Sequence, residues 1–342
     1  TDDGIWKLPN GDAYYAYLLK QHTTTSLKPE QIHQLGVAEV ARIQAEMMKI
    51  LQSLPTPVAG DTVAQKMSAL AGLPQMQYAD SDEGRAQILA DYKLILKDID
   101  SRLEPAFTKR PKAELDVQRV PEFSEKTAPG AYYNMPALDG SRPGIFFANL
   151  YDVRATPKFG MKTLAVHEGI PGHHFQIALQ QELSGLPTFR KLLPFTVFAE
   201  GWALYTEQLM AELGLYHNDP YGDLGRLQGE LFRSIRLVVD TGIHHKRWTR
   251  EQAIAYMSEN AGMAKSDVEA EIERYIVMPG QACAYKIGML KLLELRTKAQ
   301  TALGDKFKLT EFHQTILQNG SMPLELLERV VDGYIAKHQS SK

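Results

Sequence analysis

The chain has 342 residues, of which 44% are hydrophobic and 23% charged, so it can bury a sizeable core in one large domain or two closely joined ones. Its net charge of -3 gives no electrostatic reason to expect a nucleic acid or an anionic membrane as partner. No apolar run approaches the roughly 18 to 20 residues that a transmembrane helix needs. The single cysteine, Cys283, excludes an internal disulfide and a multi-cysteine zinc cluster.

The N-terminus begins at Thr1 without a methionine, and its first residues do not form a signal peptide. This start is typical of a processed or truncated product, and we therefore expect the C-terminal part of a longer chain. A processed N-terminus favours a periplasmic or cell-envelope location over a cytoplasmic one.

Residues 1–105 have the pattern of helices. Apolar residues recur at helical spacing after Pro29 and predict a long helix to about Leu54. A short helix is expected near residues 62–71, and a longer one from about Ser81 to Leu103. Residues 1–26 predict a short helix and a turn.

The pattern changes to alternation between residues 111 and 150. Alternating or β-prone runs occur at 115–120, 131–135 and 144–149, and a turn signal occupies 138–143. We predict a small antiparallel sheet. Its extended edge could hold an extended peptide by strand addition, and a purely structural hairpin is the equal alternative.

Helical patterns return at residues 156–342. The expected helices run from about Lys158 through a histidine-rich motif towards Leu183, from near Pro194, from Asp223 to His244, from Gln281 to about Ala302, and near 310–318 and 323–337. Two further helices are expected to begin at capping boxes, which are formed by Thr249 with Gln252 and by Ser266 with Glu269. The fold class is therefore mainly α, with a small antiparallel sheet, in a single catalytic domain over 1–342.

The motif in the centre of the chain, residues 167–174, reads His-Glu-Gly-Ile-Pro-Gly-His-His. A His-Glu-x-x-His helix binds zinc through two imidazoles one turn apart and leaves the glutamate as general base. Here the second histidine position is Pro171, and on a straight helix neither His173 nor His174 could share a metal with His167. Pro171 and Gly172 could supply a bulged turn that brings one of them back. A structural histidine cluster is the alternative.

A catalytic zinc site needs a third protein ligand and an open position for water. Glu200 is the best candidate, because it follows an apolar run and precedes Gly201 and Trp202. Its alternative role is a buried carboxylate paired with an arginine. Glu207 lies two turns later on the same face and could be the ligand or could orient a ligating histidine.

Two residues in the last third are candidates for the rest of a catalytic site. His244 ends a polar stripe with Arg236 and Asp240, a pattern that is typical of a solvated face, although Gly242 and Trp248 beside it suit a substrate pocket. Tyr285 stands one turn after Gln281, so that both could point into one cleft. Packing between helices is the alternative for Tyr285.

Four segments together resemble the bacterial domain-of-unknown-function family 885: 167–174, 200–205, 240–244 and 279–282. That family looks like a relative of the gluzincin peptidases, which include thimet oligopeptidase, neurolysin and carboxypeptidase Taq. The resemblance runs from about Tyr14 to the C-terminus. It implies a mostly helical metallopeptidase-like fold with a small sheet at the active-site cleft, and a zinc ion.

The resemblance also implies roles for single residues. Gly172-His173 lines up with the Gly-His of the relatives if Ile170-Pro171 is a two-residue insertion, which selects His167, His173 and Glu200 as zinc ligands. Peptidases of this group use a tyrosine from a late helix as oxyanion donor, which here corresponds to Tyr285. If Tyr285 does not have this role, Tyr275 or His244 is the next candidate.

The expected function is a zinc-dependent peptidase that cleaves peptide substrates, with Glu168 as general base. One alternative is a non-catalytic, zinc-stabilised domain that binds peptides without cutting them. Another is a zinc hydrolase of a non-peptide amide. Glu168 favours an enzyme, because a purely structural metal site needs no base beside its metal.

Overall fold

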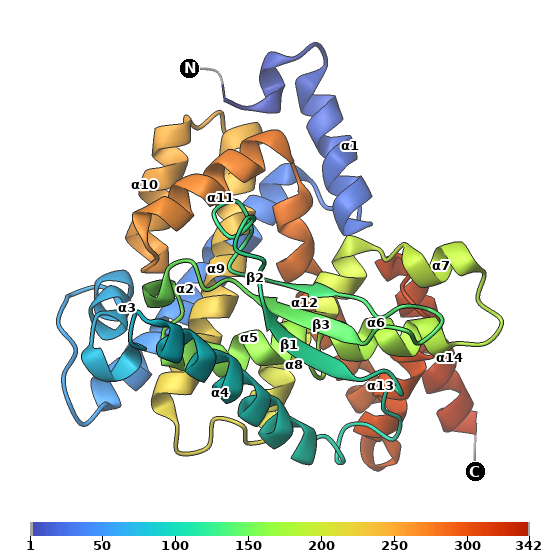
Figure 1. Ribbon diagram of the computed structural model, residues 1–342. Coiled ribbons are helices and arrows are strands. Elements are labelled where there is room, and N and C mark those ends of the chain that lie inside the picture. The colour runs from blue at the N-terminus through green and yellow to red at the C-terminus, as the bar shows by residue number, and fades with distance from the viewer. Residues whose placement is uncertain (1–2, 341–342) are drawn as a thin grey trace. The chain divides into compact units, whose positions relative to one another are not determined.

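The computed structural model describes residues 3–340 and is mainly helical, with one small sheet (Figure 1). The chain forms two compact units, each assembled from separate segments. Unit 1 contains Gln77 and the described residues before it, Pro157–Gly160 and Asn218–Ile287. Unit 2 contains Tyr78–Thr156, Met161–His217 and the described residues from Gly288 onward. The expectation of a single catalytic domain over the chain stays a prediction.

Over the described residues, unit 1 contains helices and loops but no strand. Its elements are η1 (Ile5–Lys7), α1 (Gly11–Thr23), α2 (Pro29–Ser53), α3 (Val63–Ala71), η2 (Pro74–Met76), η4 (Lys158–Gly160), α9 (Pro220–His244), α10 (Arg250–Ala261), α11 (Lys265–Val277) and η5 (Gln281–Cys283). The helix α12 (Ala284–Leu303) begins in unit 1 and continues in unit 2. The expected helices of this part of the sequence are thereby confirmed, with small shifts at their ends.

The core of unit 1 is built around the long helices α2 and α9. Ile43 and Met47 of α2 and Ile235 of α9 are fully buried in one apolar cluster. A glycine allows this close packing, because a Cβ atom at Gly36 would lie 2.7 Å from the Cβ of Leu237. The helical spacing of apolar residues in the sequence therefore marks the buried face of α2.

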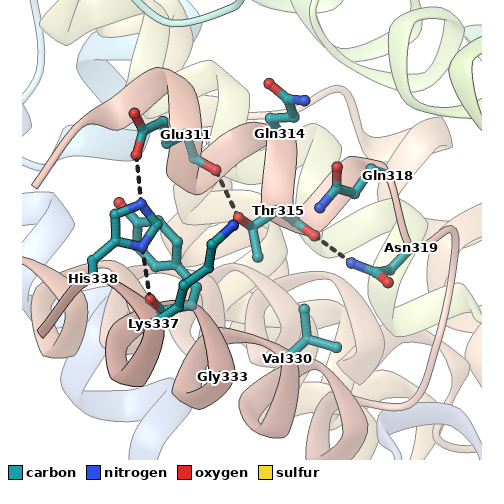
Figure 2. A pocket seen from close by; sticks show the side chains of 10 residues that line it. Glu311, Gln314, Thr315, Gln318, Asn319, Val330, Gly333, Lys337 and His338 are labelled. Atoms are coloured by element: carbon teal, nitrogen blue, oxygen red, sulfur yellow. Dashed lines mark hydrogen bonds and ion pairs between the residues drawn. The ribbon is translucent and has the colours of Figure 1, made fainter. Parts of the chain in front are cut away.

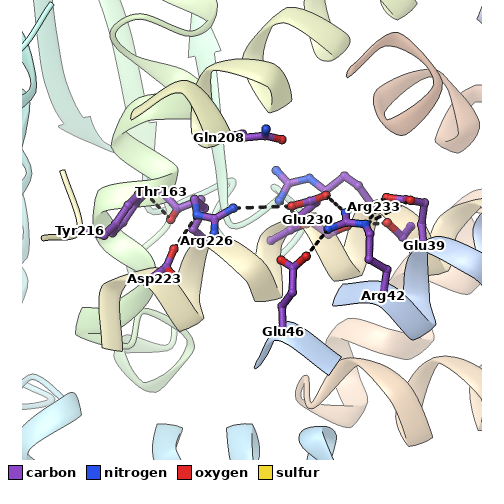
Figure 3. Close-up of polar contacts among 12 residues, drawn as sticks. Glu39, Arg42, Glu46, Thr163, Gln208, Tyr216, Asp223, Arg226, Glu230 and Arg233 are labelled. Carbon is purple, nitrogen blue, oxygen red and sulfur yellow. Dashed lines mark hydrogen bonds and ion pairs between the residues drawn. The ribbon is translucent and has the colours of Figure 1, made fainter. Parts of the chain in front are cut away.

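A buried network of charges crosses the same unit (Figure 3). The Lys286 Nζ atom, which is fully buried, lies 2.6 Å from Glu230 Oε1 and 2.8 Å from Glu39 Oε2. Arg42 pairs with Glu230 as well. Burial alone would raise the pKa of the Glu230 carboxyl, but the neighbouring cations hold that pKa below its usual value. These charges are paired, as buried charges must be.

One of the two predicted capping boxes is present. Thr249 caps α10, and Gln252 completes the box as predicted. The prediction for α11 is wrong, because this helix begins at Lys265 after Ala264, whose side chain makes no capping hydrogen bond. Ser266 and Glu269 lie inside the helix, where the same residue types are also tolerated.

Unit 2 combines helices with the sheet. Its elements are α4 (Asp82–Ser101), β1 (Leu115–Arg119), β2 (Ala131–Asn134), β3 (Gly144–Ala148), η3 (Val153–Ala155), α5 (Met161–Glu168), α6 (His173–Glu182), α7 (Thr188–Leu192), α8 (Thr196–Glu212), η6 (Gly304–Lys306), α13 (Leu309–Leu317) and α14 (Leu324–Ser340). Helix α4 packs against β1 and α5, and α5 packs against β2 and α8.

The sheet is mixed, which corrects the predicted antiparallel sheet. Its strand order is β1-β3-β2, with β2 and β3 antiparallel and β1 and β3 parallel. A parallel pair needs a crossover of about a dozen residues or more, and the segment 120–143 provides it. Alternation indicates a strand but not its direction. The mostly buried β3, with the sequence Gly-Ile-Phe-Phe-Ala, has the nearly continuous apolar pattern of a central strand.

No helix among residues 3–340 is both long and apolar enough to cross a membrane, which agrees with the expectation from hydropathy.

A buried neutral histidine connects helices of unit 2. His313 of α13 is fully buried, where its Nδ1 donates to the Ala106 carbonyl at 2.9 Å and its Nε2 accepts from the Tyr205 hydroxyl at 2.7 Å. Burial lowers the pKa of His313 to about 3. The unfolded chain would protonate this imidazole near pH 6.5.

This difference predicts acid sensitivity. Because the folded-state pKa is depressed, the stabilisation is complete above pH 6.5 and is lost as the pH falls towards 3, by about 2 kcal/mol at pH 5. The free energy of unfolding, measured by urea titration, should decrease between pH 7 and pH 5 by about 2 kcal/mol less in His313→Gln than in the wild type. The exposed His217→Gln is the control and should keep the wild-type slope. An unchanged slope in His313→Gln would contradict the assignment.

Candidate metal site

The histidine motif is divided between two helices. Helix α5 ends at Glu168, a turn of four residues containing a cis Ile170-Pro171 peptide bond follows, and α6 begins at His173. The predicted continuous helix from Lys158 to Leu183 is therefore wrong. Pro171 lacks the N–H that would continue the helical hydrogen bonds. Gly172 passes so close to α5 that a Cβ atom there would lie 2.1 Å from the His167 carbonyl oxygen.

This turn brings the three predicted ligands together. Glu200 Oε2, from the first turns of α8, lies 3.4 Å from His167 Nε2 and 3.3 Å from His173 Nε2. One donor atom of each residue lies within 4.8 Å of the other two. The side chains are mostly buried, with 4%, 11% and 19% of their surface exposed for His167, His173 and Glu200.

The two distances from Glu200 to the histidine nitrogens match those between ligands of a tetrahedral ion. Ligands at about 2.0 to 2.1 Å from zinc lie roughly 3.3 to 3.4 Å from one another in a tetrahedral arrangement. Glu200 Oε2 has no hydrogen bond of acceptable geometry in the described structure, although both imidazole nitrogens are near. Both imidazole nitrogens therefore lie beside the same carboxylate oxygen, and this donor set fits a zinc ion.

A second carboxylate orients one of the two imidazoles. Glu207 Oε1 lies 2.7 Å from His167 Nδ1, and the glutamate is fully buried. This contact directs Nε2 of His167 towards Glu200. Of the two predicted roles of Glu207, the structure favours orientation of a ligand, an arrangement that is common around metal-bound histidines.

His174 has different partners. Its Nδ1 accepts from the Tyr133 hydroxyl at 3.0 Å, and its Nε2 donates to the Ala113 carbonyl at 3.1 Å. Burial lowers the pKa of His174 to about 4, so that the imidazole is neutral at physiological pH. Both nitrogens are engaged in contacts with the sheet region. His173 is therefore the histidine that lies with His167 and Glu200.

Close packing fixes the position of α8 and thus of Glu200. A Cβ atom at Gly201 would lie 2.5 Å from the Cα of Gly288, so the two glycines allow α8 and α12 to touch. The Trp202 indole donates to the Pro171 carbonyl at 2.8 Å. The tryptophan thereby connects α8 directly to the turn between the two histidines. Single-sequence patterns do not reveal the Gly201–Gly288 pairing, because the two residues are far apart in the chain.

The charges of the site depend on one another. Burial alone would raise the pKa of the Glu200 carboxyl, but the imidazoles of His173 and His167 hold that pKa well below its usual value. Glu168, the predicted base, is 8% exposed at the end of α5. Burial, together with the charge of Glu168, raises the pKa of Tyr92. Tyr92 is thus a neighbour of Glu168 that the sequence did not indicate.

His244 and Tyr285 belong to unit 1, and their predicted catalytic roles stay predictions. The His244 Nδ1 accepts from the Ile5 amide at 3.1 Å, and its Nε2 donates to the Tyr275 carbonyl at 3.0 Å. The Tyr285 ring lies 4.5 Å from the Arg236 guanidinium. A polar stripe of this pattern is typical of a solvated helix face, but the stripe that contains His244 is buried. The backbone contacts of His244 favour a structural role.

A separate cleft of about 470 Å³ lies between α13 and α14 (Figure 2). Its lining includes Glu311 and His338, which form an ion pair at 3.0 Å. None of the predicted site residues lines this cleft. It is therefore distinct from the group of His167, His173 and Glu200.

Comparison with known proteins agrees with the fold. The profile of a family described as "Bacterial protein of unknown function (DUF885)" matches residues 1–331. The crystal structure of a "putative lipoprotein from Colwellia psychrerythraea" is similar, with 50% sequence identity and a TM-score of 0.96 over 98% of this chain and 57% of that chain. A "putative lipoprotein of unknown function from Shewanella oneidensis" shares 23% identity and has a TM-score of 0.79, over 93% and 59% of the two chains.

The second of these similarities, at 23% identity, shows the fold alone. The chain spans less than two thirds of the length of either solved relative. No curated protein matches it.

The geometry predicts opposite effects of two neighbouring substitutions. His173→Ala removes a donor of the group, so zinc affinity should fall by roughly 10²-fold or more. His174→Ala should keep about one zinc per chain but lower the free energy of unfolding by about 1 to 3 kcal/mol, because it leaves buried hydrogen-bonding groups without partners. Equilibrium dialysis with elemental analysis measures the zinc. The reverse result would make His174 the ligand.

Proposed function

The chain belongs to the DUF885 family of bacterial proteins of unknown function, and we propose that it is a zinc-dependent peptidase related to the gluzincins. The observation that carries the proposal is the convergence of three donors, His167, His173 and Glu200, from three different helices. Three protein ligands leave one tetrahedral position open, which is the arrangement of catalytic rather than structural zinc sites.

The residues of the chain then have distinct roles. Bound zinc would polarise the scissile carbonyl and make water a nucleophile at neutral pH. Glu168 adjoins His167 in sequence, accepts the proton of the attacking water and returns it to the leaving amine. Glu207 keeps the His167 imidazole oriented through Nδ1. The site therefore needs no residue outside unit 2 to activate water.

The edge of the sheet supports an extended peptide as substrate. The backbone N–H of Asn149 donates to the Gly130 carbonyl at 3.0 Å, so these two residues form a hydrogen-bonded pair of the antiparallel ladder. Hydrogen-bonded and non-hydrogen-bonded pairs alternate along such a ladder. Ala131 and Tyr133 therefore belong to non-hydrogen-bonded pairs, and their backbone N–H and C=O groups point away from β3, along the outer edge. This edge can pair with an added strand.

The two edges of the sheet differ. On β1, the Val117 amide donates to the Asp116 carboxylate at 2.8 Å, which occupies part of that edge. Strand β2 packs against α5, which carries His167 and Glu168, and Tyr133 bonds to His174 beside His173. A peptide paired with β2 would therefore run close to the metal ligands.

Two alternatives remain as proposals of lower rank. A zinc hydrolase of a non-peptide amide would use the same donors and the same base. A non-catalytic, zinc-stabilised peptide-binding domain would use the donors and the β2 edge. Glu168 favours the enzymes, since a domain that only binds peptides does not need a carboxylate next to a ligand.

We also propose a periplasmic or cell-envelope location. The support is that the solved relative from Colwellia psychrerythraea, which shares 50% sequence identity, is described as a putative lipoprotein.

Replacing the base should separate chemistry from metal binding. In Glu168→Gln, about one zinc per chain should remain, while turnover should fall by about 10² to 10⁴. The assay is digestion of a mixed peptide library by the zinc-loaded chain, with mass spectrometry of the products. Glu182→Gln, at the end of α6 and outside the donor group, serves as the control and should cleave like the wild type.

The other outcomes favour the alternatives. Loss of zinc from Glu168→Gln would make Glu168 a ligand. Binding of peptides without cleavage by the wild type would favour the binding domain, and hydrolysis confined to non-peptide amides would favour the second enzyme.

A further inference from the structure

The segment 186–195, which connects α6 to α8 and contains α7, has an unusual distribution of side chains. Phe189 and Leu193 are 63% and 69% exposed, and Leu192 and Phe195 are 38% and 39% exposed. Large apolar side chains that are exposed singly are normal, but four within seven residues form a patch. We call these four residues the apolar patch.

The two cations of the segment point back to the protein. Arg190 Nη2 donates to the carbonyls of Asn319 at 3.0 Å and Ser321 at 3.1 Å. Lys191 Nζ donates to the Gln181 carbonyl at 2.9 Å. In a surface segment of a soluble protein, the charged groups usually face the solvent and the large apolar side chains face the protein. This segment has the opposite arrangement.

Further hydrogen bonds fix the backbone of the segment. The Gln180 side chain donates to the Arg190 carbonyl at 2.6 Å, and the Phe195 amide donates to the Ser321 hydroxyl at 2.7 Å. Ser321 in turn donates its amide to Gln180 at 2.8 Å. The outward position of the apolar patch is therefore built into unit 2, because polar contacts hold the segment at Arg190, Lys191 and Phe195.

We propose that the apolar patch inserts into the interfacial region of a lipid bilayer with anionic headgroups. Short amphipathic segments bind such surfaces through apolar and aromatic side chains next to cations. No acidic residue occurs between Glu182 and Glu200, whereas Arg190 and Lys191 add two positive charges. The chain as a whole has a net charge of -3 and both cationic groups bond to main-chain carbonyls, but this segment itself carries a net charge of +2, which attracts anionic lipid.

The size of the patch favours lipid over a second copy of the chain. Four partly exposed side chains present on the order of a few hundred Å². A stable protein interface buries about 800 Å² on each partner. Interfacial insertion needs only a few side chains, because the headgroup region surrounds them on all sides.

The test is co-flotation of the purified chain with vesicles. Binding is expected to vesicles of phosphatidylcholine with about one third phosphatidylglycerol, and weaker binding to phosphatidylcholine alone. In the double variant Phe189→Ser and Leu193→Ser, the partition constant for the anionic vesicles should fall at least about tenfold. The matched control is Leu94→Ser with Val277→Ser, which removes two side chains that are 65% and 75% exposed elsewhere.

Three results would overturn the proposal. These are no binding by the wild type, an equal loss in the control pair, and unchanged binding in the double variant. A dimer in light scattering that only the Phe189 and Leu193 changes dissolve would make the patch an interface between copies instead. Circular dichroism and melting temperature verify that both double variants fold, and neither pair includes a proposed metal ligand.

Discussion

The candidate site depends on the turn between Glu168 and His173. A continuous helix would place His173 about 240° around the axis from His167, on another face. Here Gly172 packs against the His167 carbonyl, at a distance that no Cβ atom would permit, and a separate helix, α6, starts at His173. The Trp202 indole bonds to the turn at Pro171 and so couples it to the helix that carries Glu200. The donors of three helices meet because of these contacts.

Most helices could be predicted from the sequence, since buried faces such as Ile43 and Met47 of α2 repeat at helical spacing. The direction of β1 could not, because alternation is the same in parallel and antiparallel strands. The break at Pro171 was indicated only as a possible bulge. The predicted start of α11 at Ser266 was wrong, because serine is common both as an N-cap and inside the first turn.

The site residues show the same division. The residue types of the motif suggested His167 and Glu168, and the resemblance to metallopeptidases selected His173 over His174. Geometry then gave each histidine a separate set of contacts: His173 with Glu200, and His174 with Tyr133 and Ala113. Contacts between distant segments, such as Gly201 with Gly288, follow from tertiary packing and leave no local signal in one sequence. The same limit applies to His244, whose partners are backbone groups of residues 5 and 275.

The central claim is that His167, His173 and Glu200 hold one metal ion. Anomalous diffraction from crystals of the zinc-loaded chain, recorded on both sides of the zinc absorption edge, tests it most directly. The account predicts one strong peak at about 2.0 to 2.2 Å from the Nε2 atoms of both histidines and from the Glu200 carboxylate. A peak at His174, or no peak among these three residues at stoichiometric zinc, would contradict it.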